Sequence, residues 1–146
     1  MSLGKKIDAL DDEKNTLRIF NSNAQDLNSD EIAFRTIVYE NINQELTILS
    51  LNDKNLKDID IKYLSECDFL SNLTSLDLRN NSLLTAEGFK YLADCSFIDK
   101  LTDFKIKWGI EGLEGIKYLS DYQFLNKITE LDLSCLNIKN GFFNDK

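Results

Sequence analysis

An internal repeat of 27 or 28 residues is the feature that most constrains the fold of this chain. The tripeptide Lys-Tyr-Leu begins at residues 62, 90 and 117. A second marker, Leu or Ile followed by Thr, begins at residues 46, 73, 101 and 128, so both markers keep one period. Periods in this range are typical of proteins built from stacked structural units, because one such unit cannot bury its apolar face alone.

Each repeat has two halves with different apolar spacing. Three and five positions after the start of the Leu-Thr or Ile-Thr marker, every unit has an apolar residue: Leu49 and Leu51, Leu76 and Leu78, Phe104 and Ile106, Leu131 and Leu133. This alternation predicts a short strand with one buried face. Around Lys-Tyr-Leu the apolar residues are spaced by three: Ile61 and Leu64, Phe89 and Leu92, Ile116 and Leu119. That spacing predicts a helix, so each unit is one strand plus one helix.

The corners between strands and helices contain residues that suit them. Asp58 and Thr85 are placed where a side-chain oxygen could cap the first turn of a helix. We also expect Gly88, Gly112 and Gly115 to lie near tight strand-to-helix corners.

Residues 17–45 resemble a degenerate copy of the unit and are predicted to form an N-terminal cap. Asn28 with Glu31 three positions later predicts a capping box at the start of its helix. The residues that follow place an apolar stripe on one face of this helix: Phe34, Ile37, Val38 and Ile42. Residues 1–16 are polar and charged, and we expect this segment to be frayed.

The stretch from Leu73 to Leu83, with Leu76, Leu78 and Asn81 at fixed offsets and with Gly88, Leu92 and Ala93 after it, resembles a leucine-rich repeat of the ribonuclease-inhibitor-like type. The resemblance implies an α/β solenoid with a short parallel sheet on the concave side and helices on the convex side. Its single domain would cover residues 17–146, with the cap at 17–45, full repeats at 46–72, 73–100 and 101–127, and a truncated repeat at 128–146.

The chain departs from that pattern where the family has an asparagine. The equivalent positions hold Lys54, Asn81, Gly109 and Leu136, so only one unit keeps the side chain that satisfies the backbone of the turn. The other corners therefore need water or other partners for their backbone groups. A doubly wound sheet is the alternative fold, but it needs about 30 or more residues per strand-helix-strand unit.

Composition excludes several classes of function. The 146 residues contain no His and carry a net charge of −8. Nucleic acid is therefore a poor partner, and the usual base of hydrolases and ligand of zinc is missing. No apolar run approaches the about 18 residues of a membrane span, and no signal-peptide core is present. Three Cys without a metal-binding spacing indicate reduced thiols in the cytoplasm. We expect a protein that is not an enzyme and has no cofactor or metal.

The spacing of the residues concerned disfavours both acid–base catalysis and a disulfide. Asp77 and Asp132 share an outward strand position, but Lys105 stands between them on the intervening strand. A cross-strand ladder of Ser50, Asp77, Lys105 and Asp132 explains them better than acid–base catalysis does. Cys67 and Cys95 occupy equivalent places in successive helices, too far apart for a disulfide and consistent with buried structural thiols.

The outward positions of the strands predict a site for a protein partner. Trp108 follows the third strand and lies next to Lys107, and Trp and Arg are enriched at binding hot spots. Trp108 could equally be packed over the glycine-rich turn, and both interpretations stay open. The partner-binding residues we predict are Asp77, Arg79, Asp103, Lys105, Lys107, Trp108, Glu130 and Asp132.

A second hypothesis is a structural or self-assembly module that works through the ends of the solenoid. The fourth unit has a strand but no room for a helix, and it closes on Asn140-Gly141-Phe142-Phe143. The two Phe side chains could fold back over the terminal core, or they could meet their copies in a twofold dimer. We favour a monomer, because this end offers less area than a stable interface needs.

Overall fold

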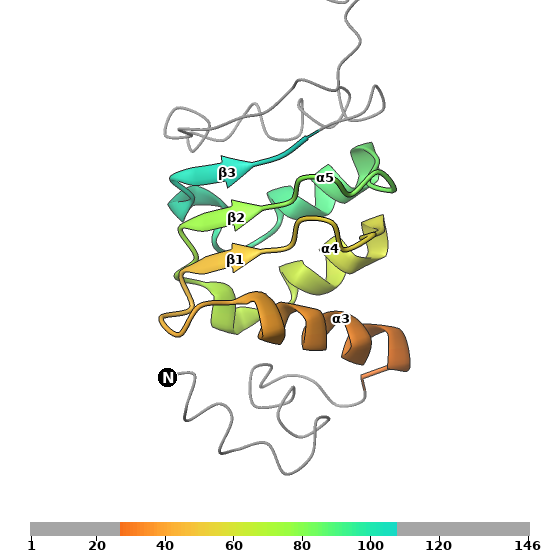
Figure 1. The fold of residues 1–146 in the computed structure, drawn as a ribbon, viewed down its shortest axis with the longest axis horizontal. Coiled ribbons are helices and arrows are strands. Elements are labelled where there is room, and N and C mark those ends of the chain that lie inside the picture. The colour runs from red at the N-terminus through yellow and green to blue at the C-terminus, as the bar shows by residue number, and fades with distance from the viewer. Residues whose placement is uncertain (1–26, 108–146) are drawn as a thin grey trace, which may run out of the picture.

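The computed structural model describes residues 27–107, which form three parallel strands alternating with three helices (Figure 1). The order is α3 (Ser29–Asn41), β1 (Ile48–Ser50), α4 (Asp58–Ser65), β2 (Ser75–Asp77), α5 (Ala86–Ala93) and β3 (Asp103–Lys105). Short 3-10 turns follow α4 and α5, at Asp68–Leu70 and Ile98–Lys100. The predictions for residues 1–26 and 108–146 lie outside the described residues: the polar segment, the first part of the cap, the helix of the third repeat and the truncated repeat.

The strands pair in the order of the sequence, β1-β2-β3, and all are parallel. The register places Leu49 beside Leu76 and Leu76 beside Phe104, so the sequence period of 27 or 28 residues equals one step across the sheet. In each strand the central residue is buried and its two neighbours are more exposed. The strands and their buried faces predicted for these three units are confirmed.

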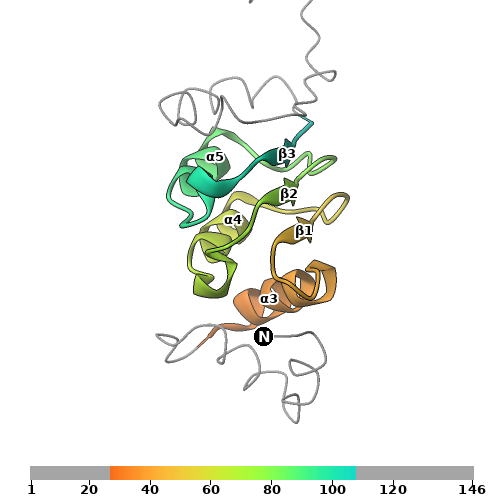
Figure 2. The same ribbon diagram turned by 90° about the vertical axis from the view of Figure 1, so that its left-hand side faces the viewer.

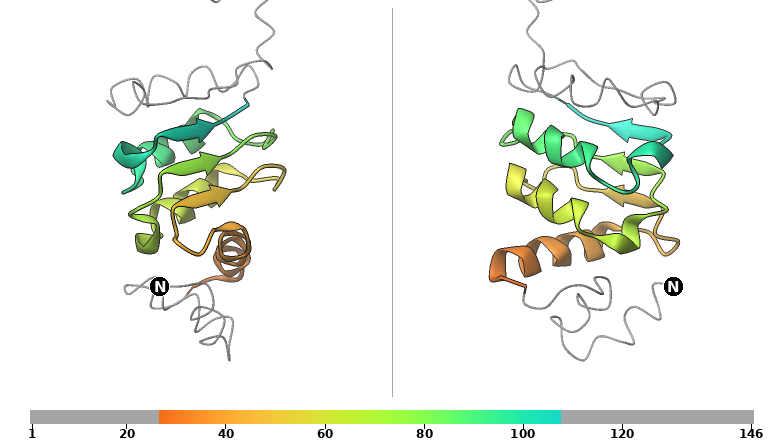
Figure 3. Two further views of the ribbon diagram at one scale, coloured as in Figure 1. Left: turned by 60° about the vertical axis from the view of Figure 1, so that its left-hand side comes forward. Right: turned by 180° about the vertical axis from the view of Figure 1, so that it is seen from behind.

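The helices cover one side of the sheet. Figure 2 shows α4 and α5 side by side in one layer with the three strands in the other, and the right-hand view of Figure 3 shows the same two helices from behind. Their inward residues are those the spacing predicted: Ile61, Leu64, Phe89 and Leu92. α3 lies at one end of the stack, where it contacts α4 and β1. A single apolar core runs from α3 to β3 between the two layers.

The apolar stripe predicted for α3 is confirmed, since Phe34, Val38 and Ile42 are buried and Ile37 packs against the core. The side chain of Asn28 caps this helix by accepting a hydrogen bond from the backbone N–H of Glu31. The other half of the expected capping box differs, because the Glu31 carboxylate binds a buried arginine on its own helix.

That arginine is Arg35, which is only 1% exposed. Its Nε and Nη2 donate to Oε1 of Glu31 at 3.1 and 2.9 Å, and its Nη1 donates to Sγ of Cys67 at 3.4 Å. A guanidinium with the carboxylate of Glu31 beside it can be buried, because the ion pair offsets part of its desolvation cost. The cluster joins α3 to Cys67, two residues after the end of α4.

The outer edge of β1 is closed by the chain that leads into it. Ile42 forms an antiparallel bridge with Leu49. The side-chain oxygen of Asn43 accepts hydrogen bonds from the backbone N–H groups of Thr47 and Ile48. The backbone N–H of Asn43 donates to the Ile48 carbonyl. Polar backbone groups that an edge strand would otherwise present are thereby satisfied within the chain. The edge of the described sheet at β1 is therefore covered by the segment that joins α3 to this strand.

The predicted helix caps are half right. Thr85 caps α5, accepting from the backbone N–H of Glu87. Asp58 does not cap α4: Lys57 is the N-cap residue, and the carboxylate of Asp60 accepts from its backbone N–H. The Asp58 carboxylate instead reaches the next unit, where it accepts from the backbone N–H and the hydroxyl of Thr85. The first residue of α4 therefore bonds to the N-cap residue of α5.

Gly88 lies in the first turn of α5, three residues after the N-cap Thr85 and thus near the strand-to-helix corner, as expected. A Cβ atom at this position would stand 2.5 Å from Oδ1 of Asp58. Glycine is needed here because the carboxylate that bonds to Thr85 passes so close to the helix.

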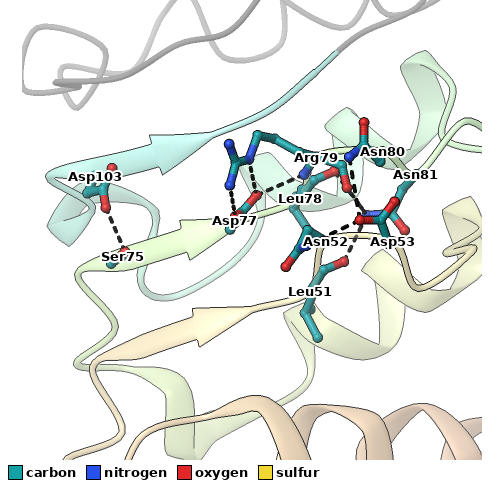
Figure 4. Close-up of polar contacts among 10 residues, drawn as sticks. All are labelled: Leu51, Asn52, Asp53, Ser75, Asp77, Leu78, Arg79, Asn80, Asn81 and Asp103. Atoms are coloured by element: carbon teal, nitrogen blue, oxygen red, sulfur yellow. Dashed lines mark hydrogen bonds and ion pairs between the residues drawn. The ribbon is translucent and has the colours of Figure 1, made fainter.

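Asn81 satisfies two corners at once (Figure 4). Its Nδ2 donates to the carbonyls of Leu78 and Leu51, both at 2.9 Å, the second across to the preceding unit. Its Oδ1 accepts from the backbone N–H groups of Lys54 and Leu56, also in the preceding unit, at 3.1 Å each. In the preceding unit Lys54 stands where the pattern has an asparagine, and Asn81 of the next unit satisfies the backbone groups of that corner.

The second unit contains one residue more than the first between this corner and its helix. Leu83, which aligned with the last leucine of the repeat pattern, is 51% exposed, and Leu84 is the buried residue at 8%. Leu84 stands 28 positions after the buried Leu56, while the strands of these units are 27 apart. The extra residue lets the chain bulge outward at Leu83.

Candidate protein-interaction surface

The side of the sheet opposite α4 and α5 presents the outward side chains of all three strands. We call this surface the open face. Because alternate residues of a strand point to opposite sides, the face is set by the neighbours of the buried residues. It consists of Ile48, Ser50, Asn52, Ser75, Asp77, Arg79, Asp103, Lys105 and Lys107.

Five of the eight predicted partner-binding residues lie on the open face: Asp77, Arg79, Asp103, Lys105 and Lys107. All five are half-buried. The remaining three, Trp108, Glu130 and Asp132, lie outside the described residues, and their place on this face stays a prediction.

Asp77 and Arg79 form a bidentate ion pair at the centre of the open face (Figure 4). Nε of Arg79 donates to Oδ1 of Asp77 at 3.0 Å, and Nη2 donates to Oδ2 at 2.8 Å. The backbone N–H of Arg79 also donates to Oδ1, at 3.0 Å. Three donors from one residue hold the carboxylate in a single orientation.

The pKa of Asp77 is lowered from its ordinary value. Partial burial alone would raise this pKa, but the side-chain and backbone hydrogen bonds from Arg79 outweigh it. The positive charges of Arg79 and Lys105 act in the same direction. Asp77 is therefore held as a carboxylate and has no tendency to act as a proton donor near neutral pH.

The cross-strand row Ser50–Asp77–Lys105 has the register predicted for it. The ion pair of Asp77 differs from the ladder we expected, because it forms along the chain with Arg79. Lys105 lies beside Asp77 in the register of the neighbouring strand, and its positive charge also lowers the pKa of the Asp77 carboxyl. The fourth member of the ladder, Asp132, lies outside the described residues.

A second polar contact crosses the sheet at the start of the strands. The Ser75 hydroxyl donates to Oδ2 of Asp103 at 2.9 Å (Figure 4). Ile48, the third member of this row, is 48% exposed. Neither the Ser75–Asp103 hydrogen bond nor the exposure of Ile48 follows from residue type alone. The spacing of 28 residues between Ser75 and Asp103 could have suggested their hydrogen bond.

Cys67 and Cys95 are free and buried at equivalent positions after α4 and α5. Burial raises the pKa of the Cys67 thiol to about 12. Burial likewise raises the pKa of Cys95. Both thiols donate to the carbonyl of the tyrosine four residues earlier, Tyr63 and Tyr91. These are features of inert structural cysteines, because only the thiolate is a strong nucleophile. Cys135 lies outside the described residues.

Sequence reasoning missed the buried ion pair of Glu31 and Arg35. Glu31 is predicted only as the partner of Asn28 in a capping box, and no role is predicted for Arg35. Their spacing of four, in line with Val38 and Ile42 on the same helical stripe, is the signal that could have revealed it.

Neither metal-binding clusters nor membrane-spanning helices were found in residues 27–107. No group of three or more Cys, Asp or Glu side chains in this part of the chain could hold a metal ion. None of its helices has the length and apolar character needed to cross a membrane.

Comparisons of the whole chain with protein-family models, with curated proteins and with solved structures each found no match.

Proposed function

We propose that the chain is a leucine-rich repeat solenoid of the ribonuclease-inhibitor-like type that binds a protein partner through its open face and catalyses no reaction. The observation that carries this proposal is the open face itself, a contiguous set of outward side chains from three successive parallel strands. The strand-plus-helix unit, its period and the inter-unit contacts of Asn81 support the family assignment.

A protein suits this face better than a small ligand does. Three strands spaced by about 4.8 Å give an open sheet surface with mostly polar side chains, whereas small molecules are usually held in enclosed, largely apolar pockets. Mixed charges with one exposed aliphatic side chain are ordinary components of protein interfaces. In this proposal the protein works in the reducing cytoplasm, where buried free thiols such as Cys67 and Cys95 persist.

The test is affinity capture from native lysate with the full chain and two matched variants. Ile48→Arg/Ser50→Arg alters the open face, whereas Ile59→Arg/Ser65→Arg makes the same two changes on α4. Both sets of positions are at least partly exposed, so both variants should fold. The wild type and the α4 variant should retain the same protein, and the open-face variant should lose it.

Retention by all three proteins would contradict the assignment of the site. If no protein is captured but the molecular mass of the pure chain rises with its concentration, that result would instead support self-assembly through the solenoid ends.

Trp108 has its own test within this proposal. If Trp108→Ala abolishes capture and leaves the melting temperature nearly unchanged, Trp108 is a binding anchor. If the same substitution costs several kcal/mol of stability, Trp108 is a packed corner residue.

A further inference from the structure

The corner between β2 and α5 satisfies its backbone differently from the corner before it. In the first unit the backbone N–H of Leu56 donates to Oδ1 of Asn81, which belongs to the next unit. The equivalent partner for Leu84 would be a side chain at position 109, 28 residues after Asn81, but the sequence has glycine there. Leu84 instead donates its backbone N–H to the carbonyl of Asn81, at 3.2 Å. This bond closes a four-residue turn, which is why the second corner needs one residue more than the first.

Ser82 and Leu83 occupy the two central positions of this turn, and both are exposed. Neither residue has a positive φ, so the backbone of the turn puts no special demand on their side chains. Central turn positions are most often filled by Gly, Pro, Asn, Asp or Ser, as Ser82 illustrates. The turn is closed by backbone groups alone and therefore does not explain a leucine at position 83.

The place of Leu83 in the fold distinguishes it from other exposed apolar side chains, which are common on protein surfaces. Three large apolar side chains are exposed in residues 27–107, and Leu83 is the most exposed of them at 51%. Ile48 is part of a strand and Ile59 is part of a helix, whereas Leu83 stands at the tip of a turn. A side chain at a tip can enter a pocket that the flank of a strand or helix cannot reach.

Both ends of the turn are fixed. Asn81 is buried and bonded to backbone groups of two units. Leu84 belongs to the apolar core, and the residue after it, Thr85, donates its backbone N–H and its hydroxyl to the Asp58 carboxylate. A segment that is already held in one conformation loses less conformational entropy when it binds, so preorganisation of this kind favours affinity.

We propose that Leu83 is an anchor that inserts into an apolar pocket of a different protein, with Ser82 at the polar edge of that contact. Aliphatic anchors seated in pockets are a common centre of protein interfaces. The inference goes beyond the proposed function, because the turn lies outside the open face and follows the last open-face residue of its unit, Arg79 (Figure 4).

A pocket on another protein suits this tip better than other occupants do. The chain carries a net charge of −8, so a second copy, an anionic membrane and a nucleic acid would all be repelled. The tip itself is uncharged, and it offers nothing that would offset this repulsion. An apolar pocket gains free energy by removing the Leu83 side chain from water, whatever the net charge of the chain.

The experiment places the photoreactive residue p-benzoylphenylalanine at position 82 of the full chain, so that Leu83 itself is kept. Irradiation in native lysate should give one predominant covalent adduct with another protein. Peptide mapping of the adduct should place the attachment among apolar residues of that protein. Adding Leu83→Ser to the labelled chain should lower the adduct yield at least tenfold.

Two matched variants control this measurement. Ile59→Ser makes the same kind of change at an aliphatic side chain of similar exposure, 42%, on α4, and should lower the yield less than twofold. Leu83→Met keeps an apolar side chain of similar volume and should lower the yield less than threefold. All these variants change exposed side chains, so each should keep the melting temperature of the labelled chain.

Four results would overturn the inference: no adduct from position 82, an adduct made of two copies of this chain, an adduct that persists in Leu83→Ser, or equal losses with Leu83→Ser and Ile59→Ser. None of them decides the proposed function, because the lysate experiment with Ile48→Arg/Ser50→Arg reports binding at the open face separately.

Discussion

Asn81 shows how one side chain can fix the spacing of neighbouring units. It is 4% exposed, and its side-chain amide forms hydrogen bonds with backbone groups of its own corner and of the corner in the preceding unit. Backbone groups that are buried without a partner cost about 1–3 kcal/mol each. An amide has both donors and an acceptor, so it can serve N–H and C=O groups together.

Asn81→Ala should therefore lower the free energy of unfolding by at least about 2 kcal/mol, because it leaves the Leu56 N–H and the Leu51 carbonyl without their partner. Urea denaturation measures the change. The matched control is Asn80→Gly, at an exposed neighbour with φ of 59° that glycine adopts readily. Equal stability of the two variants would show that the Asn81 bonds do not hold the corners together.

Arg79 has a structural role that its outward position did not suggest. Arg79 donates three hydrogen bonds to the Asp77 carboxylate, two from its guanidinium and one from its backbone N–H. The side-chain donors are lost in Arg79→Ala. Since Arg79 is 36% exposed, we expect a loss of only about 0.5–1 kcal/mol at pH 7.

The loss should depend on pH in a defined direction. The folded-state pKa of Asp77 is lowered, so the stability that the pair contributes is present above the ordinary Asp pKa and is lost as pH falls through the lowered value. The difference in unfolding free energy between the wild type and Arg79→Ala should thus shrink as pH falls below the ordinary Asp pKa of about 3.9. A difference that stays constant from pH 7 to pH 2 would assign the effect to packing of the Arg79 stem.

At the scale of elements, α4 and α5 are coupled through Asp58 and Gly88. Alanine is normally favoured over glycine inside a helix by about 1 kcal/mol. Here the new Cβ would stand 2.5 Å from Oδ1 of Asp58, the oxygen that accepts the Thr85 N–H. Gly88→Ala must displace that carboxylate and should destabilise the protein despite its helix propensity.

A double-mutant cycle separates the two effects. In the Asp58→Ala background the obstructing oxygen is gone, and Gly88→Ala should then stabilise the protein by up to about 1 kcal/mol. Thermal and urea unfolding of the four proteins measure the coupling. A Gly88→Ala effect of the same sign and size in both backgrounds would show that α4 and α5 are not joined through this contact.

The same elements show what the sequence could predict. Leu49, Leu76 and Phe104 recur with a fixed period, and burial of one strand face follows from that period alone. The partner of Asp58 could not be predicted, because a short carboxylate can reach either its own helix or Thr85 in the next unit, and only the packing of the helices decides. On the open face, period and alternation placed Lys105 and Lys107, but not which cation would bind Asp77.

At the scale of the whole molecule, the described part has one continuous core. Buried residues at the two ends, such as Val38 in α3 and Phe104 in β3, belong to the same apolar cluster. Stacked units that share a core in this way can unfold together or, if the contacts between units are weak, one after another. Helix α3 is linked by buried Arg35 to Cys67, just after α4, and the Ile42 bridge links the end of α3 to β1, which favours joint unfolding.

Val38→Ala tests that coupling from one end. Removal of two buried methyl groups should cost about 2 kcal/mol with the cavity they leave. If the core unfolds as one unit, the Leu78 and Thr102 amides, which bond between β2 and β3, should exchange hydrogen about 30-fold faster, as should the amides of α3. Glu40→Ala, at an exposed position of α3, should leave all these rates nearly unchanged. Faster exchange confined to α3 would show that this helix opens independently and that the strands are stable without it.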